Sequence, residues 1–182
     1  MKTFVTLAFV LALNGAEPAV PAAMPRPQYS AGNQLLRPTG YREWIFIGSS
    51  LGMGYREGTG DQAPAFHNVY MQPEAYGIYK ATGNFPDKTM MVMELAAAGA
   101  DVSINKQGKF EDRFLGIEMS VKDESRFPEK WAYFNFIGEG GAQLAQAKPI
   151  AKEACWSCHN AHAEADNVFV QFYPVLKAAR KR

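Results

Sequence analysis

The chain has only two cysteines, and a histidine directly follows the second of them: Cys155, Cys158 and His159. The Cys-x-x-Cys-His pattern is the attachment signature of c-type haem. Two thiols on one helical turn can each add to a vinyl group of the porphyrin, and the next histidine then lies beneath the iron as its axial ligand. The pattern therefore predicts one covalently attached haem c, with Cys155 and Cys158 as its anchors and His159 as the iron ligand.

Two other chemistries use the same residue types. A redox dithiol of the thioredoxin kind also has this cysteine spacing, but it opens a helix in a β-α-β setting, which the sequence does not indicate. A structural zinc site needs four ligands. Cys155, Cys158 and His162, with His159 or His67, would supply them. Haem c is the favoured interpretation because its motif is the most specific of the three.

The function of a mono-haem protein depends on the sixth coordination position of its iron. A methionine or histidine there makes a six-coordinate electron-transfer cytochrome, whereas a free position makes a site for small ligands or oxidation chemistry. His67 and His162 are the only other histidines. His162 is three residues from His159, which is too near to reach the opposite side of the haem. His67 lies in a predicted strand and is either a distal ligand or a hydrogen-bonded structural residue.

The region before the motif is rich in strand patterns. The predicted strands cover residues 44–47, 66–71, 90–95, 114–121 and 131–137. In the fourth of them the alternation assigns Leu115, Ile117, Met119 and Val121 to one face and Phe114, Gly116, Glu118 and Ser120 to the other. The connections are too varied for regular β-α-β units, so the sheet is predicted to be mainly antiparallel.

Three segments have helical patterns. Pro73 suits the first position of a helix that Gly83 would end. Residues 143–155 are rich in alanine, with a break at Pro149, and residues 166–180 read as a terminal helix bent at Pro174. An exposed turn is expected over residues 105–109. These elements predict an α+β fold, mainly an antiparallel sheet with flanking helices and a C-terminal haem-attachment region.

Charge and hydropathy narrow the class of protein. The net charge is +1 with acids and bases mixed along the chain, which argues against nucleic-acid binding. Residues 1–23 have an early lysine, a short apolar run and small residues, as in a secretory signal cleaved after Ala16 or Ala23. No later apolar run is long enough to span a membrane. We expect an exported, periplasmic protein with a poorly ordered Pro-rich leader over residues 24–40 and a haem domain over 41–182.

The chain resembles the cytochrome P460 family from about Tyr41 to Ala179. The resemblance is carried by the haem motif and by the segments Tyr41-Arg42-Glu43-Trp44, Phe66-His67-Asn68-Val69-Tyr70, Thr82-Gly83-Asn84-Phe85-Pro86-Asp87 and Val168-Phe169-Val170-Gln171-Phe172-Tyr173-Pro174-Val175-Leu176. The last segment, and its spacing from the motif, is the most specific.

This resemblance implies a sheet-dominated, often dimeric protein with one haem, His159 as proximal ligand and an open distal face. Cytochromes P460 proper oxidise hydroxylamine and carry a lysine cross-linked to the haem. The cytochrome c′-β type lacks that cross-link and binds nitric oxide and carbon monoxide in a more apolar pocket. A partner cytochrome for electron exchange is also expected.

Three positions bear on whether the chain resembles the cytochromes P460 proper or the cytochrome c′-β type. Met93 occupies the position of the cross-linking lysine, where a methionine would pack against the porphyrin edge. Lys88 lies five residues earlier, and an odd displacement reverses the face of a strand, so no lysine cross-link is expected. Glu118 matches the distal carboxylate that serves as proton acceptor in the oxidising members. His67 falls where those enzymes can carry a distal arginine. Ligand binding is therefore the first functional hypothesis, ahead of hydroxylamine oxidation and plain electron transfer.

Overall fold

A five-stranded antiparallel sheet dominates the computed structural model, which describes residues 24–54 and 63–180. The strands are β2 (Ile45–Leu51), β3 (Ala65–Met71), β4 (Met90–Gly99), β5 (Phe110–Lys122) and β6 (Trp131–Asn135), paired in that order. A separate two-stranded ribbon pairs β1 (Leu35–Leu36) with β7 (Gln146–Ala147). All five predicted strands are present, and the α+β class with an antiparallel sheet is confirmed.

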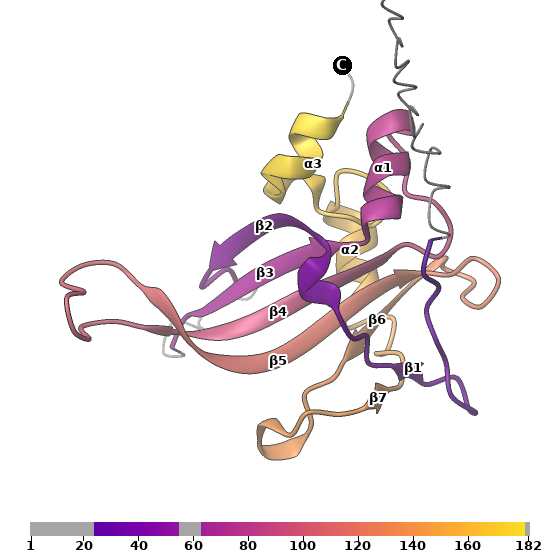
Figure 1. The fold of residues 1–182 in the computed structure, drawn as a ribbon. Coiled ribbons are helices and arrows are strands. Elements are labelled where there is room, and N and C mark those ends of the chain that lie inside the picture. The colour runs from indigo at the N-terminus through magenta and orange to yellow at the C-terminus, as the bar shows by residue number, and fades with distance from the viewer. Residues whose placement is uncertain (1–23, 55–62, 181–182) are drawn as a thin grey trace, which may run out of the picture.

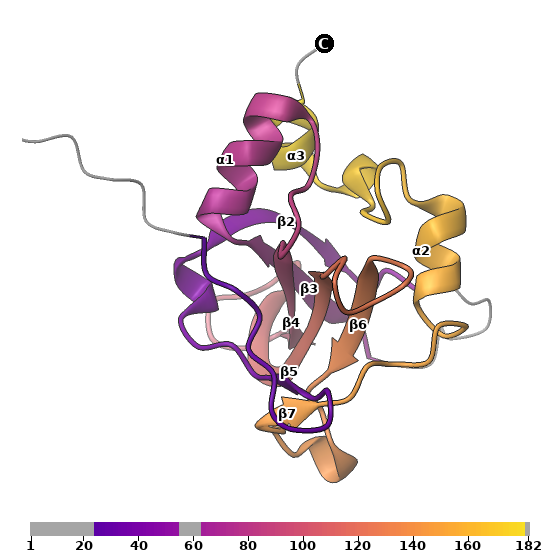
Figure 2. The ribbon, with the colours of Figure 1, turned by 90° about the vertical axis from the view of Figure 1, so that its right-hand side faces the viewer.

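Three short α-helices flank the sheet: α1 (Pro73–Thr82), α2 (Trp156–His162) and α3 (Pro174–Ala179). Single turns of 3-10 helix lie at Tyr41–Glu43, Glu139–Gly141 and Val170–Phe172. Figures 1 and 2 show α1 and α3 side by side over the β2 end of the sheet, and α2 beside β6. The helix predicted from Pro73 to Gly83 is confirmed, since Pro73 occupies its first turn and Gly83 ends it with a φ of 76°.

The two C-terminal helix predictions are wrong in extent. Residues 143–155 form no helix. The chain runs past the free edge of β6, where Pro149 bridges to Phe134 and the Ile150 amide donates to the Tyr133 carbonyl at 2.8 Å, and residues 152–155 then form turns that lead into α2. Proline has no backbone N–H, so it is tolerated at a sheet edge where its position is not required to donate a hydrogen bond. The helix predicted over residues 166–180 is replaced by a tight turn, a 3-10 turn and then α3. Pro174 begins α3 instead of bending a longer helix.

A β-bulge changes the phase of β5. Leu95 pairs with Gly116 and Ala96 with Phe114, so Leu115 is the extra residue on the β5 side. Gly116 has a φ of 151°, a conformation that side chains rarely adopt. The alternation predicted from the sequence holds from Ile117 to Val121 but fails beyond the bulge. Phe114 packs on the same face as Ile117, and not with Glu118 as the alternation predicted.

Each face of the sheet buries its own core. The face under the helices packs strand residues against α1 and α3, through Ile47, Val69, Met71, Met91, Tyr133, Ala75, Tyr79 and Leu176. The other face packs against the N-terminal segment, through Val92, Ile117, Met119, Phe134, Phe136, Leu35 and Tyr41. Both faces of β4 are apolar over most of their length. On β5 one face carries Ile117, Met119 and Val121, whereas the face toward the helices carries Glu118, Ser120 and Lys122.

The N-terminal leader differs from expectation where it is described. Leu35 is 1% exposed, the Gln72 side chain donates to the Pro25 carbonyl at 2.6 Å, and the Arg126 guanidinium lies 3.9 Å from the centre of the Tyr29 ring. Residues 24–40 thus pack along the domain instead of forming a loose tether. The predicted signal peptide, residues 1–23, lies outside the described residues.

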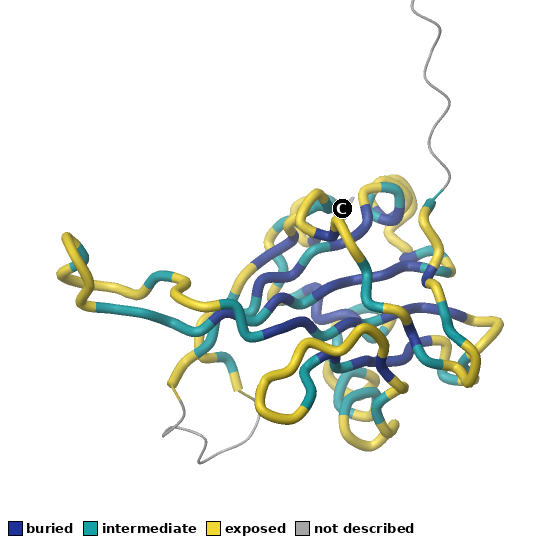
Figure 3. The backbone as a smooth tube through the Cα atoms, turned by 60° about the horizontal axis from the view of Figure 1, so that its bottom comes forward, coloured by how far each residue is buried: buried dark blue, intermediate teal, exposed yellow. Residues whose placement is uncertain are grey.

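The β4–β5 hairpin projects beyond the rest of the molecule, as the exposed loop in Figure 3 shows. The expected turn over residues 105–109 lies at its tip, where Ile104 is 92% exposed. Among the described residues, none of the helices has the length and apolar character needed to cross a membrane.

Candidate functional site

The imidazole of His159 is held in one orientation by its surroundings. It lies on α2, half-buried between the rings of Tyr133 and Phe169, whose centres are each 4.4 Å from its own. Its Nδ1 is 2.8 Å from the main-chain oxygen of Asn167. A carbonyl can only accept, so Nδ1 carries the proton and Nε2 is left with its lone pair. Burial lowers the pKa of His159, with the Asn167 carbonyl opposing the shift, and this favours the neutral form that binds metals.

The two cysteines lie on the same turn of chain as this histidine. Cys155 immediately precedes α2 and Cys158 lies within it, and both are half-buried free thiols. Burial raises the pKa of Cys155, and the charges of Glu118 and Cys158 raise it further. The raised pKa of Cys155 is unlike that of a reactive redox dithiol, whose thiolate is stabilised. Two unpaired thiols on one turn of chain suit thioether formation to a porphyrin.

Across from His159, the sheet contributes Met93 and Glu118 to the same cavity. These two residues are directly opposed in the β4–β5 register, and Val69 on β3 is paired with Met93. The free space between the sheet and the C-terminal segment, counted together with the open solvent at its mouth, is about 580 Å³. Its remaining lining comes from Met91, Met119, Ser120, Tyr133, Phe134, Ile150, Cys155, Asn167, Val168, Phe169 and Tyr173. The structure thus brings together four predicted site residues, namely Cys155, His159, Met93 and Glu118.

Glu118 is the one carboxylate in this lining. Its side chain has no hydrogen bond or ion pair to any other described residue, and burial raises its pKa. A carboxyl group in such surroundings binds a proton more readily than an exposed one, which is the property of a general base that operates near neutral pH. Burial is the physical cause of the shift, with the apolar Met93 paired to Glu118 on β4 and Asn135 paired to it on β6.

His67 is placed elsewhere. It lies on β3, opposite Ser50 on β2 and Leu95 on β4. It lines a smaller adjacent cavity that shares Val69, Met93 and Tyr173 with the main one but includes neither His159 nor Glu118. Burial lowers the pKa of His67, so the side chain is neutral at pH 7. The structure does not bring His67 and His159 into one cavity.

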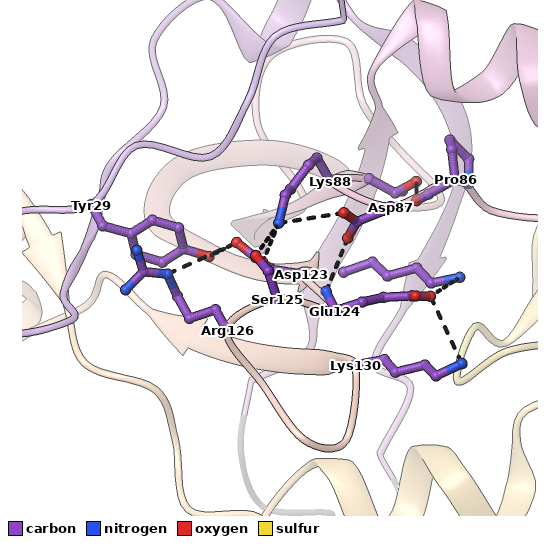
Figure 4. Close-up of polar contacts among 11 residues, drawn as sticks. Tyr29, Pro86, Asp87, Lys88, Asp123, Glu124, Ser125, Arg126 and Lys130 are labelled. Carbon is purple, nitrogen blue, oxygen red and sulfur yellow. Dashed lines mark hydrogen bonds and ion pairs between the residues drawn. The ribbon is translucent and has the colours of Figure 1, made fainter.

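Lys88 is directed away from the site. It precedes β4 with a φ of 68°, and its ammonium group binds the Asp123 carboxylate and donates to Ser125 Oγ at 2.8 Å. Figure 4 shows this group of charged residues, in which Asp123 also accepts from Tyr29. The geometry agrees with the expectation that Lys88 does not substitute for the residue at position 93.

The sequence reading missed the residues that surround the imidazole. Asn167 supplies its main-chain oxygen, and Tyr133 and Phe169 supply the rings. The signal for Asn167 was the Asp166-Asn167 pair, which favours a tight turn but was assigned to the terminal helix. No short pattern reveals that Tyr133, on β6, meets α2.

The donor set fits a haem and does not fit zinc. The cavity combines the Cys155 thiol, an imidazole with Nε2 available, a mainly apolar lining and a buried Asn167 side-chain amide nitrogen that has no partner among the described residues. Cys158 lies on the same turn of chain as Cys155 but is not part of the lining. Within residues 24–54 and 63–180, no three or more His, Cys, Asp or Glu side chains are arranged to hold a metal ion. His162 is exposed on α2. The fold also lacks the β-α-β unit of a thioredoxin-like site among its described elements.

The comparisons identify the family. The model of the family described as cytochrome P460 matches residues 38–170. This match covers most of the chain, so the chain belongs to the cytochrome P460 family, a family of haem c cytochromes. No curated protein matches the sequence.

Proposed function

We propose that this chain carries a single haem c, attached through Cys155 and Cys158, and binds nitric oxide or a related small nitrogen species on the side opposite His159. The observation that carries the proposal is the cavity itself. One wall holds Cys155 and His159 of the attachment motif, and the opposite wall is the largely apolar sheet around Met93, with Glu118 beside it.

The anchoring wall supports covalent attachment and axial ligation. Cys155 and Cys158 follow one another on a single helical turn, and the Asn167 carbonyl fixes the protonated nitrogen of His159. When bound, the haem supplies an iron centre at which a small ligand can coordinate. The chain then contributes the histidine beneath, the anchoring thiols at the edge and the rings that exclude water.

The sheet wall supports a ligand pocket without a cross-link. Met93 stands where the cross-linked relatives carry lysine, and the neighbouring Val69 and Met91 are also apolar. Apolar walls favour uncharged ligands such as nitric oxide and carbon monoxide because such ligands lose little hydration on entry.

Absorption spectroscopy of the protein from a host that attaches haem c tests this proposal. We expect a high-spin ferrous spectrum that changes on addition of nitric oxide or carbon monoxide, and a mass increased by one porphyrin. A sharp low-spin spectrum that ignores carbon monoxide would overturn the proposal and favour electron transfer. In that case, a change to high spin in Met93→Leu but not in Met91→Leu would identify Met93 as the sixth ligand.

The position of Glu118 favours a second candidate function, hydroxylamine oxidation. Its unpartnered carboxylate lies in the same cavity as His159 and can accept a proton from a bound substrate. Turnover of hydroxylamine with an artificial electron acceptor should then fall at least tenfold in Glu118→Gln. The matched control is Glu139→Gln, because Glu139 is exposed and distant in the fold. Equal turnover in both variants would remove Glu118 as the base.

Export is part of the proposal because residues 1–23 have the early lysine, short apolar run and small residues of a secretory signal. The mass of mature protein recovered from a periplasmic extract would locate the cleavage, with masses for chains beginning at Glu17 or Met24 as the expected outcomes. Recovery of the uncleaved chain in the cytoplasm with haem attached would contradict export.

A further inference from the structure

The structure contains a built support for His159 that lies outside the attachment motif. The carbonyl oxygen that accepts from His159 belongs to Asn167, the second central residue of a tight turn from Ala165 to Val168. The Val168 amide donates to the Ala165 carbonyl at 2.8 Å, and the Ala165 amide returns a bond at 3.4 Å. The two central residues, Asp166 and Asn167, have φ values of 45° and 61°.

The backbone of this turn has positive φ angles, which most residues adopt only at an energetic cost. Positive φ at both central positions is the mark of the type I′ turn. Asp and Asn tolerate it better than other residues with a side chain, yet each such residue still carries a conformational cost. The turn is therefore expected to depend on contacts from outside it.

The outside contacts come from the Asp166 carboxylate. Its Oδ2 accepts from Lys122 Nζ at 2.8 Å, and its Oδ1 accepts from Trp131 Nε1 at 3.0 Å. Lys122 ends β5 and is 8% exposed, and Trp131 begins β6 and is 2% exposed. The Lys122 ammonium is itself held by the Phe85 carbonyl at 2.8 Å. Two rigid strand residues thus hold both oxygens of one carboxylate.

The same turn reaches the imidazole. The Asn167 carbonyl accepts from His159 Nδ1 and, at 3.3 Å, from the Tyr133 hydroxyl. Tyr133 also packs on the His159 ring. A continuous set of contacts therefore runs from Lys122 and Trp131 through Asp166 to the oxygen that orients His159. Figure 2 shows this connecting segment between α2 and α3.

We propose that Asp166 is a positioning residue, and that its carboxylate holds the Asn167 carbonyl where it keeps His159 oriented and electron-rich as an axial ligand. A firm acceptor on Nδ1 increases the donor strength of the other ring nitrogen. Strong axial donation stabilises the oxidised iron and lowers the reduction potential. The inference rests on the proposed role of His159 and deepens it.

The test compares haem-loaded variants by two readings of the iron–histidine bond, its ferrous stretching frequency in resonance Raman spectra and the reduction potential. Asp166→Ala removes both acceptor oxygens, and we expect a lower frequency and a more positive potential. Asp166→Asn keeps the turn preference and one acceptor oxygen, so it should shift both readings less. Trp131→Phe removes the N–H donor together with part of the buried ring and should shift them in the same direction.

A matched control separates positioning from general damage. Glu124→Gln alters an exposed residue whose carboxylate lies 3.4 Å from the same Lys122 ammonium but does not touch the turn, and it should match the unmodified protein.

The outcomes distinguish this inference from the proposed function. If the unmodified protein takes up no haem or shows no iron–histidine band, the proposed function fails. If the band is present and Asp166→Ala leaves both readings where Glu124→Gln leaves them, the positioning role is refuted. If Asp166→Ala yields no folded protein, Asp166→Asn and Trp131→Phe decide by the same comparison.

Discussion

Replacing Asp123 with asparagine should lower the free energy of unfolding by about 3 kcal/mol at pH 7. The Asp123 side chain is 5% exposed and binds the Lys88 ammonium. It also accepts from Ser125 Oγ at 2.7 Å and from the Tyr29 hydroxyl at 3.3 Å. Figure 4 shows how these contacts join the N-terminal segment to the loops that flank β4 and β5.

The magnitude follows from those contacts. A hydrogen bond to a charged group contributes roughly 1.5–3 kcal/mol, and asparagine keeps only a neutral acceptor. Breaking a buried ion pair costs about 3–5 kcal/mol, but Lys88 retains Asp87 as a second partner at 3.4 Å, which places the loss near the lower end. Urea unfolding followed by tryptophan fluorescence measures the difference.

The pH dependence supplies the sharper test. Burial alone would raise the pKa of Asp123, but hydrogen bonds from Lys88 and Ser125 and the charge of Lys88 lower it overall. A folded-state pKa below the unfolded one gives stability that is complete above the unfolded value, near pH 4, and is lost as pH falls through the folded value. The gap between unmodified protein and Asp123→Asn should therefore close below about pH 4.

The matched control is Glu124→Gln in the neighbouring position. The Glu124 carboxylate is 42% exposed and its ion pairs are 3.4 and 3.8 Å long, so its loss should cost under about 0.5 kcal/mol. The reasoning is refuted if Asp123→Asn unfolds at the same urea concentration as Glu124→Gln, or if its deficit persists unchanged at pH 3.

Three further predictions follow from single sites. Gly116→Ala should lower the free energy of unfolding by about 2 kcal/mol or more, because the added Cβ would lie 2.4 Å from Ile137 Cγ1 at a φ of 151°. In the control Gly77→Ala, within α1, the added Cβ meets no atom, so this variant should be slightly more stable in thermal unfolding. If Glu118 is a base, turnover of hydroxylamine should rise with pH through its raised pKa, since the ionised form accepts the proton, and this step should vanish in Glu118→Gln. His67→Leu should leave the spin state of the ferrous haem unchanged, because His67 lines a separate cavity; a low-spin to high-spin change would instead identify it as a ligand.

The parts of the fold that depend on local patterns could be predicted from the sequence. Pro73 begins the α1 helix and Gly83 ends it, and each affects only the adjacent turn of the helix, so the sequence alone reveals both ends. The strands are predictable because each has an apolar or aromatic run of its own. The extended segment through Pro149 could not be predicted, because its alanine-rich composition favours a helix while the free edge of β6 offers pairing that only the folded sheet provides. The bulge at Leu115 was also hidden, since it is visible only as a mismatch between β4 and β5.

The residues of the candidate site also differ in whether local sequence patterns or the folded sheet reveals them. The wall with Cys155, Cys158 and His159 is a contiguous motif, so its chemistry can be read directly. The facing wall needs the β4–β5 register, which sets Met93 opposite Glu118 across 25 positions of chain. The support behind His159 is the least visible, because it joins Asp166 to Lys122 across 44 positions through side chains whose types are common on protein surfaces.

The residues that control the haem environment lie mostly outside the motif. In the proposed function the motif attaches the haem, but its five residues do not determine how firmly the His159 ring is held or what lies across the cavity from it. Those properties depend on β4, β5 and β6, since these strands carry Met93, Glu118, Lys122, Trp131 and Tyr133. A relative with an identical motif and different residues at these positions would have a different ligand pocket and a different axial bond. Exchanging these strand residues, and not the motif, is therefore the expected route by which one sheet supports either ligand binding or oxidation.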